Sequence, residues 1–124
     1  MGTILIVDDS LFIRMKIAEL VQRAGYEVVG FGTNGQEAID LYNQHKPDLT
    51  LLDITMPIKD GLTALKEIKQ NDVNAKVIMV SAMSQSMVIS QAIENGAIDF
   101  IEKPIHDLKI LKLLRRIFST NISN

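Results

Sequence analysis

Four short apolar runs of this chain each end on a polar side chain, and the chemistry of the polar group differs from run to run. The polar ends, in chain order, are Asp8 and Asp9 after residues 4–7, Asp53 after 49–52, Ser81 after 77–80, and Lys103 after 99–102. Carboxylates bind Mg²⁺ in proteins, and a carboxylate can attack phosphorus as a nucleophile. A hydroxyl and an ammonium group can stabilise phosphoryl oxygens. Gathered together, these groups would form a cation and phosphoryl site.

The pattern of apolar residues alternates between strand and helix about five times, which predicts the elements that position these groups. The expected strands are 3–7, 26–31, 49–54, 76–80 and 98–101, and the expected helices are 11–24, 35–43, 62–70, one that Ser84 or Ser86 caps and that ends at Gly96, and 107–118. Right-handed crossovers turn this order into an α/β fold, a doubly wound parallel sheet of five strands with helices on both faces. The carboxyl ends of such strands meet at one edge, where ligands bind.

The composition favours one compact domain over residues 1–124, since 47% of the residues are hydrophobic. Thirteen basic and 15 acidic residues give a net charge of -2, which offers no basis for binding nucleic acid. The chain has no cysteine, which excludes disulfides and thiolate chemistry. Its apolar runs are too short to span a membrane, and its start does not resemble a signal peptide. We therefore expect a cytoplasmic protein that does not contact membranes.

Each polar residue also has an ordinary structural explanation when taken alone. Asp8 and Asp9 precede a predicted helix, where capping side chains are favoured, Ser81 could be a turn hydroxyl, and Lys103 could be solvated. Asp53 is harder to explain, because it ends the most apolar run several residues before any helix, and a buried unpaired carboxylate costs several kcal/mol. Because the predicted fold places all of these residues at one edge of the sheet, a shared role in one site is favoured over separate structural roles. We assign Asp53 as the phosphoryl acceptor, Lys103 as the fixed cation and Ser81 as the hydroxyl donor.

The motifs that carry these residues resemble those of a response-regulator receiver domain of the CheY type. The matching segments span most of the chain in order: residues 7–10 (VDDS), 52–57 (LDITMP) with Asp60-Gly61, 80–82 (VSA) and 100–104 (FIEKP). No single segment is specific, but their combination is. The resemblance implies the strand order 2-1-3-4-5 of flavodoxin-like folds.

The resemblance also implies roles for the site residues. Asp53 would take a phosphoryl group from a histidine kinase or a small phosphodonor. Asp9, Asp53 and the main-chain carbonyl of Thr55 would bind Mg²⁺, and Asp8 would act through metal-bound water. The peptide bond before Pro104 is typically cis in the family, which places the matching lysine in the site.

In the family, phosphorylation moves the hydroxyl residue and turns an aromatic side chain inward, and these positions are Ser81 and Phe100 here. The change remodels the face made by the fourth helix, the fifth strand and the fifth helix, which we expect to bind a target protein or a second receiver. The last helix carries more apolar positions than one buried stripe needs, so some should stay exposed beside Phe100. These positions are Leu108, Ile110, Leu111, Leu113, Leu114, Ile117 and Phe118.

One competing hypothesis is a dinucleotide-binding site, because residues 30–35 (GFGTNG) fit the pattern G-x-G-x-x-G. The pattern follows the second predicted strand, whereas the fingerprint belongs to the first strand-helix turn, and the chain lacks a second mononucleotide-binding half. These glycines are better explained by a turn before a helix.

The alternative function is a Mg²⁺-dependent phosphatase or phosphotransferase built on a similar α/β core. Such enzymes usually need an aspartate two residues after the nucleophile as general acid, and Thr55 occupies that position here. They also carry cap insertions that hold the substrate, for which no gap between the predicted elements is long enough. The sequence favours a signalling module and leaves open whether the domain works alone or within a longer protein.

Overall fold

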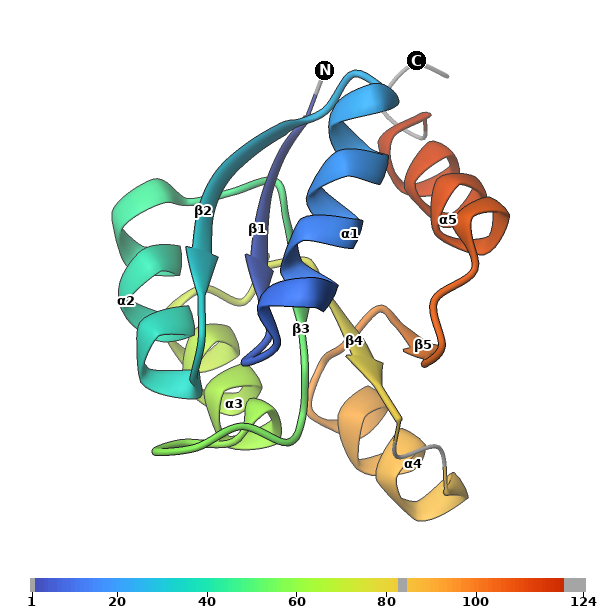
Figure 1. The fold of residues 1–124 in the computed structure, drawn as a ribbon. Helices are drawn as coiled ribbons and strands as arrows, with labels where there is room; N and C mark the ends of the chain where they lie inside the picture. The colour runs from blue at the N-terminus through green and yellow to red at the C-terminus, as the bar shows by residue number, and fades with distance from the viewer. Residues whose placement is uncertain (1, 83–84, 120–124) are drawn as a thin grey trace.

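The computed structural model describes residues 2–82 and 85–119, in which strands and helices alternate (Figure 1). In chain order the elements are β1 (Thr3–Val7), α1 (Leu11–Arg23), β2 (Glu27–Gly32), α2 (Gly35–His45), β3 (Leu49–Leu52), α3 (Gly61–Asn71), β4 (Val77–Ser81), α4 (Ser86–Glu94), β5 (Asp99–Glu102) and α5 (Asp107–Ser119). Among the residues described, no helix is long and apolar enough to cross a membrane.

The five strands form one parallel sheet in the order β2-β1-β3-β4-β5, as predicted. The registers align the carboxyl ends of neighbouring strands: Val7 pairs with Leu52, and Leu52 pairs with Met79. On the outer side of β4, Ser81 pairs with Glu102. The residues that follow these positions therefore share one edge of the sheet.

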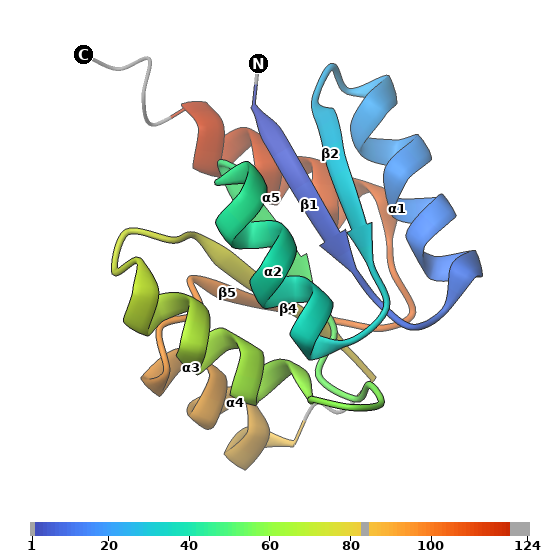
Figure 2. The ribbon, with the colours of Figure 1, turned by 90° about the vertical axis from the view of Figure 1, so that its left-hand side faces the viewer.

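The helices cover both faces of the sheet, and α2 and α5 lie on opposite sides of β1 (Figure 2). On one face, α1 and α5 bury a cluster that includes Ile17, Val21 and Leu114. On the other face, α2, α3 and α4 bury a second cluster that includes Tyr42 and Leu65. Because both faces are covered, the three inner strands β1, β3 and β4 are buried nearly throughout, which is why their sequences are largely apolar.

One predicted boundary, at the end of the third strand, is wrong. The third strand was expected to reach residue 54, but β3 ends at Leu52. The backbone N–H of Asp53 still donates to the Val7 carbonyl at 2.9 Å, and the side chain of Asp53 then accepts from the N–H of Ile54 at 2.8 Å. This local bond occupies the N–H of Ile54, so that donor is not used for pairing with a neighbouring strand. The other strand and helix boundaries differ from the predicted ones by no more than two residues.

The expected cap of the fourth helix is also wrong for Ser86. This residue is the first of α4, and the preceding Gln85 takes the N-cap position without a side-chain hydrogen bond. Ser84, the other expected cap, lies outside the described residues. Asn34, by contrast, caps α2 as predicted, because its side chain accepts from the N–H of Glu37.

The expectation that some apolar residues of α5 stay exposed holds for only one of the seven positions. Four of the seven apolar positions are buried against the sheet, and Leu111 and Phe118 are half-buried. Phe118 packs on Tyr26, with the ring centroids 4.8 Å apart, so its ring packs against the core at the end of α5. Leu108, at the start of the helix, is the one apolar side chain of α5 that is strongly exposed. The strongly amphipathic helix thus satisfies almost all of its apolar positions internally.

Candidate functional site

Backbone hydrogen bonds between strand ends bring the predicted site residues together at the carboxyl edge of the sheet. The N–H of Asp8 donates to the Gly32 carbonyl at 3.0 Å, and the N–H of Lys103 donates to the Ser81 carbonyl at 2.9 Å. With the bond from Asp53 to Val7, these contacts extend the sheet pairing past the ends of the strands. The acids, the hydroxyl and the lysine therefore come from four different strands and meet at one place.

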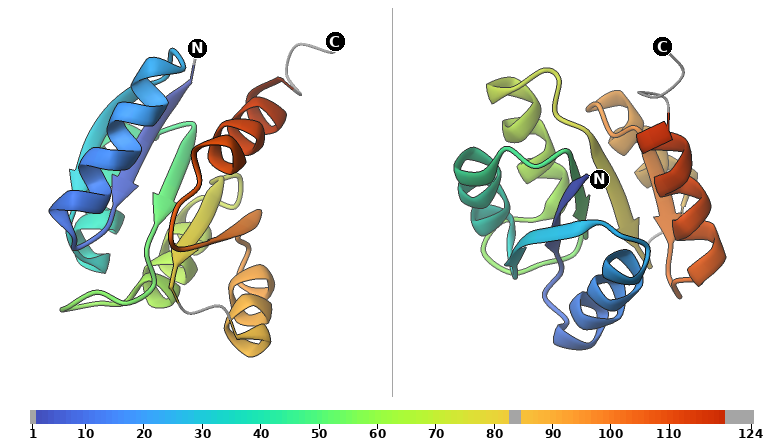
Figure 3. Two further views of the ribbon diagram at one scale, coloured as in Figure 1. Left: turned by 45° about the vertical axis from the view of Figure 1, so that its right-hand side comes forward. Right: turned by 90° about the horizontal axis from the view of Figure 1, so that it is seen from above.

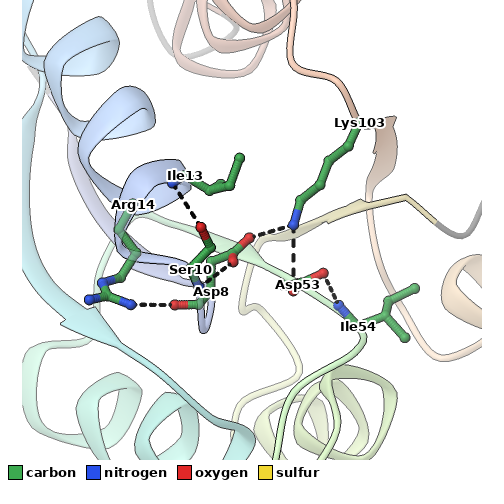
Figure 4. A network of polar contacts seen from close by, with 7 residues as sticks. All are labelled: Asp8, Ser10, Ile13, Arg14, Asp53, Ile54 and Lys103. Carbon is green, nitrogen blue, oxygen red and sulfur yellow. Dashed lines mark hydrogen bonds and ion pairs between the residues drawn. The ribbon is translucent and has the colours of Figure 1, made fainter.

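Lys103 bridges the two buried acids (Figure 4). Its Nζ atom lies 2.7 Å from Oδ2 of Asp8 and 3.5 Å from Oδ2 of Asp53. Asp8 is 2% exposed and Asp53 is 4% exposed, so these ion pairs form away from bulk water. The peptide bond between Lys103 and Pro104 is cis, as the family resemblance implied, and Pro104 itself is exposed.

Asp8 is oriented by the start of α1. Its Oδ1 atom accepts from the backbone N–H of Ser10 at 2.9 Å, and Ser10 in turn caps the helix by accepting from the N–H of Ile13 at 3.3 Å. Arg14 donates from Nη1 to the main-chain carbonyl of Asp8 at 2.8 Å. The capping explanation thus applies to Ser10, whereas Asp8 points into the site. We did not predict the contact from Arg14. The only sign of it in the sequence is that Arg14 lies within the first turn of the helix that follows Asp8.

The electrostatics of the site raise the pKa of Asp53 to about 6 from its ordinary value of 3.8. Burial is the main cause, and the negative charges of Asp8 and, more weakly, Asp9 act in the same direction. The ammonium group of Lys103 and the N–H of Ile54 oppose the increase. Asp53 is therefore a carboxylate held at an electrostatic cost, which a cation would relieve.

The three carboxylates form the kind of donor set that a hard divalent cation requires. One carboxylate oxygen from each of Asp8, Asp9 and Asp53 lies within 4.8 Å of the others. Asp9 is exposed, so a cation with several bound waters could reach it. Both oxygens of Asp8 already accept hydrogen bonds, from Ser10 and Lys103, which fits a role through water better than direct ligation. Thr55 lies exposed in the loop after Asp53.

Ser81 and Phe100 lie on the two strands beyond Asp53. Ser81 ends β4 and is 1% exposed, and its carbonyl accepts from the N–H of Lys103. Phe100 lies on β5 opposite Met79 and is half-buried against the cluster formed with α2, α3 and α4. The structure thus brings a buried hydroxyl to the site edge and places the aromatic ring one strand further out.

Two glycines near the site allow loops to pack closely, and we did not predict this role. The N–H of Gly61 donates to the carbonyl of Ile54 at 2.7 Å, and a Cβ atom at Gly61 would overlap the carbonyl of Asp53. The N–H of Gly35 donates to the carbonyl of Lys59 at 2.7 Å, and a Cβ atom there would overlap the same carbonyl. The last glycine of the G-x-G-x-x-G pattern therefore joins two loops at the start of α2. From the sequence, the Asp60-Gly61 pair predicted only a turn and not this close contact.

The comparison with known proteins identifies the class to which this fold and site belong. A family model for the response regulator receiver domain matches residues 4–115, and the chain belongs to this family. Receiver domains are signalling modules of two-component systems, and this one is similar to the chemotaxis protein CheY.

Relatives and solved structures of similar length support this assignment. Chemotaxis protein CheY of Bacillus subtilis is 49% identical over 113 residues, which cover 91% of this chain and 94% of that protein. CheY of Thermotoga maritima is 46% identical over 114 residues, which cover 92% and 95% of the two chains. The crystal structure of a CheX-CheY-BeF3-Mg²⁺ complex from Borrelia burgdorferi has a TM-score of 0.91 at 36% identity and covers 94% of this chain and 88% of its own.

The raised pKa of Asp53 predicts that this residue destabilises the metal-free protein at neutral pH. The native carboxyl group takes up a proton as the pH falls through about 6, whereas the unfolded one does so only near 3.8. Stability should therefore rise as the pH falls through this window, because the native state binds more protons there. Replacing Asp53 by Asn should increase the free energy of unfolding by about 2 to 3 kcal/mol at pH 7, and the gain should vanish near pH 4.

Urea unfolding at pH 7 and pH 4, without divalent cations, measures this difference. Asp40→Asn, which neutralises an exposed acid on α2, is the matched control and should show little change at either pH. An Asp53→Asn protein that is less stable at pH 7, or whose gain does not depend on pH, would contradict the electrostatic account.

Proposed function

We propose that this chain is a cytoplasmic phosphoacceptor that takes a phosphoryl group onto Asp53 in the presence of Mg²⁺ and thereby changes which proteins it binds. The observation that carries the proposal is the environment of Asp53: a buried carboxylate with a raised pKa, 3.5 Å from the Lys103 ammonium and within a cluster of three acids. Burial and the charges of Asp8 and Asp9 destabilise the ionised form of Asp53 more than Lys103 and the N–H of Ile54 stabilise it. A pKa perturbed in this way by burial and neighbouring charges is typical of groups at functional sites.

In the proposed reaction, an Asp53 carboxylate oxygen forms a bond to phosphorus as the bond to the donor's nitrogen or oxygen breaks. The donor leaves with that electron pair and takes a proton from solvent, so no general acid from the chain is required. Lys103 lies where it can bind a phosphoryl oxygen, and the Ser81 hydroxyl can bind another after transfer. When bound, Mg²⁺ supplies charge neutralisation for the phosphoryl oxygens.

The role proposed for Asp9 predicts a loss of Mg²⁺ affinity in Asp9→Ala. Its carboxylate is exposed, so the substitution should leave the fold intact while removing one of the two direct carboxylate ligands. We expect affinity to fall at least tenfold, which corresponds to about 1.4 kcal/mol. Calorimetric titration of Mg²⁺ into wild type, Asp9→Ala and the control Asp40→Ala tests this. Equal binding by wild type and Asp9→Ala would count against the metal site.

Steady-state turnover separates the signalling module from the alternative phosphatase. A receiver should form one aspartyl phosphate per chain and show no sustained hydrolysis of small phosphate monoesters beyond its own dephosphorylation. Release of many phosphates per chain from such an ester would favour the enzyme.

We also propose that a histidine kinase supplies the phosphoryl group and that the output face consists of α4, β5 and α5. The solved Borrelia burgdorferi complex pairs a CheY with CheX in the presence of BeF3 and Mg²⁺, so a relative of this chain binds a protein partner in that state. On the present chain the groove beside Phe100 is lined by Lys109, Lys112 and Arg116 with Asp99. Arg116 pairs with Asp99 at 2.9 Å, which leaves the two lysines to recognise a target protein or a second receiver through acidic groups.

Ser81→Ala should uncouple phosphorylation from the change at this face. The variant removes a hydroxyl and little volume, so we expect Asp53 phosphorylation within about threefold of wild type. The shift of the output face should weaken, because the group that follows the phosphoryl oxygens is gone, and a coupling of about 1 to 3 kcal/mol is typical.

Backbone NMR spectra with and without beryllofluoride report this response. In wild type, amide signals of β5 and α5 should move together with those around Asp53, and in Ser81→Ala the former should move less. If only signals around Asp53 move in wild type, the proposed output face is wrong.

A further inference from the structure

A cavity lies at the opposite edge of the sheet from Asp53, where the strands begin. Its volume is about 710 Å³, compared with about 410 and 290 Å³ for the grooves along α1 and beside Phe100. This size is suited to a small ligand. Its walls come from the start of β1, the turns before β2, β3 and β4, and the end of α5, at the end of the molecule seen from above in the right panel of Figure 3. We call it the amino-end cavity.

Aromatic rings form part of the wall and are held in place. Tyr26 packs on Phe118, and a Cβ atom at Gly2 would overlap the Phe118 ring, so this glycine allows the ring its position. Tyr42 is 3% exposed and its hydroxyl donates to Oδ2 of Asp72 at 2.8 Å. Tyr26 and Phe118 are both half-buried and so keep part of their surface for a flat ligand.

Three cations and two acids line the amino-end cavity, so the net charge of its lining is positive by one. Lys46, Lys76 and Arg115 line it, and none of them forms an ion pair with another of the residues described. The two lining acids keep their negative charges, but their carboxylates are oriented by neutral hydrogen-bond donors of the chain rather than by these cations. Asp48 accepts from the N–H and hydroxyl of Thr3 at 2.9 and 3.1 Å, and Asp72 accepts from Tyr42 and from the N–H of Asn74.

Lys46 occupies its place at a conformational cost. It ends α2 with φ at 46°, a left-handed conformation that usually favours glycine or asparagine. Its Nζ atom lies 5.5 Å from the centroid of the Tyr42 ring, so the cation stays beside an aromatic face. A lysine at this position is consistent with a requirement for its side chain.

We propose that the amino-end cavity binds a nucleoside monophosphate or a closely similar aromatic anion. The unpaired cations would bind the phosphate, and the aromatic wall would stack on the base, as aromatic side chains do on nucleobases elsewhere. The site is separate from Asp53, so the inference does not rest on the proposed phosphoacceptor function. It assigns a ligand to residues that the phosphoryl site does not use.

NMR titration with AMP, adenosine and inorganic phosphate, in the absence of divalent cations, tests the proposal. AMP should bind saturably with a dissociation constant below about 1 mM and shift signals of the cavity residues. Adenosine and phosphate alone should each bind at least tenfold more weakly, because each supplies half of the recognised chemistry. The same AMP affinity in Asp53→Asn would separate this site from the phosphoacceptor site.

A pair of neighbouring variants on α5 distinguishes a built site from general attraction. Arg115→Gln removes a lining cation, and Arg116→Gln removes an equal charge one residue away that pairs with Asp99 instead. We expect AMP binding to weaken at least tenfold in the first and less than twofold in the second. Equal loss in both variants, or no saturable shift of the cavity residues at 5 mM AMP, about five times the upper bound on the dissociation constant, would overturn the proposal.

Discussion

Asp53→Asn is expected to abolish phosphoryl uptake from acetyl phosphate or phosphoramidate in the presence of Mg²⁺. Wild type should gain the mass of one phosphoryl group, and the variant should gain none. The reason is that an amide nitrogen or oxygen is a poor nucleophile toward phosphorus, whereas the carboxyl group of Asp53, with a pKa of about 6, is mostly ionised at pH 7 beside the Lys103 ammonium. Intact-mass measurement over a time course gives the result directly.

The neighbouring acids should not replace Asp53 as acceptors. Both oxygens of Asp8 are engaged, one by the N–H of Ser10 and one by Lys103 at 2.7 Å. Asp9 is exposed and lacks an ammonium partner among the residues described. Asp40→Asn serves as the control for loss of an unrelated carboxylate and should keep full uptake. Uptake that persists in Asp53→Asn would mean that another residue is the acceptor.

The fold could be predicted because the sequence marks each layer of a doubly wound sheet. Runs such as residues 4–7 are apolar throughout since both faces of β1 are covered, and helical spacing separates each run from the next. The predicted strand order 2-1-3-4-5 came from the family resemblance and is confirmed. The composition of the site also followed from the sequence, because parallel strands place the residues after Val7, Leu52 and Val80 at one edge.

What the sequence could not provide was the local geometry that depends on contacts distant in the chain. Asp53 still pairs with Val7, but its carboxylate then accepts from the N–H of Ile54, which takes that donor away from strand pairing in a way that apolar periodicity does not show. The seven apolar positions of α5 suggested an exposed face, but Phe118 turned out to pack on Tyr26 from a different part of the chain. Arg14 and the amino-end cavity likewise depend on tertiary contacts.

Gly61→Ala should destabilise the protein strongly even though local propensity favours the change. Gly61 is the first residue of α3, after the cap Asp60, and alanine is about 1 kcal/mol better than glycine within a helix. Its backbone is not in the left-handed region, so conformation alone does not require glycine. The close approach of Gly61 to the Asp53 carbonyl therefore decides that the substitution lowers the stability of the protein. A Cβ atom would have to push backbone, which cannot move as a flexible side chain does.

We expect a loss of about 3 kcal/mol in the free energy of unfolding and a melting temperature lower by roughly 10 °C. Phosphorylation should slow more than tenfold in the folded fraction, because the Asp53 backbone is the part displaced and small misplacements of a reacting group are costly. Gly30→Ala is the matched control: its Cβ would lie 3.4 Å from a Leu5 methyl group, an ordinary contact, so stability should change by less than about 1 kcal/mol. Thermal unfolding followed by circular dichroism, with uptake from acetyl phosphate measured at 20 °C below each melting temperature, roughly the margin needed for full folding, compares the two variants. If Gly61→Ala melts and reacts like Gly30→Ala, the loop after Asp53 adapts to a side chain, and Gly61 does not position the acceptor.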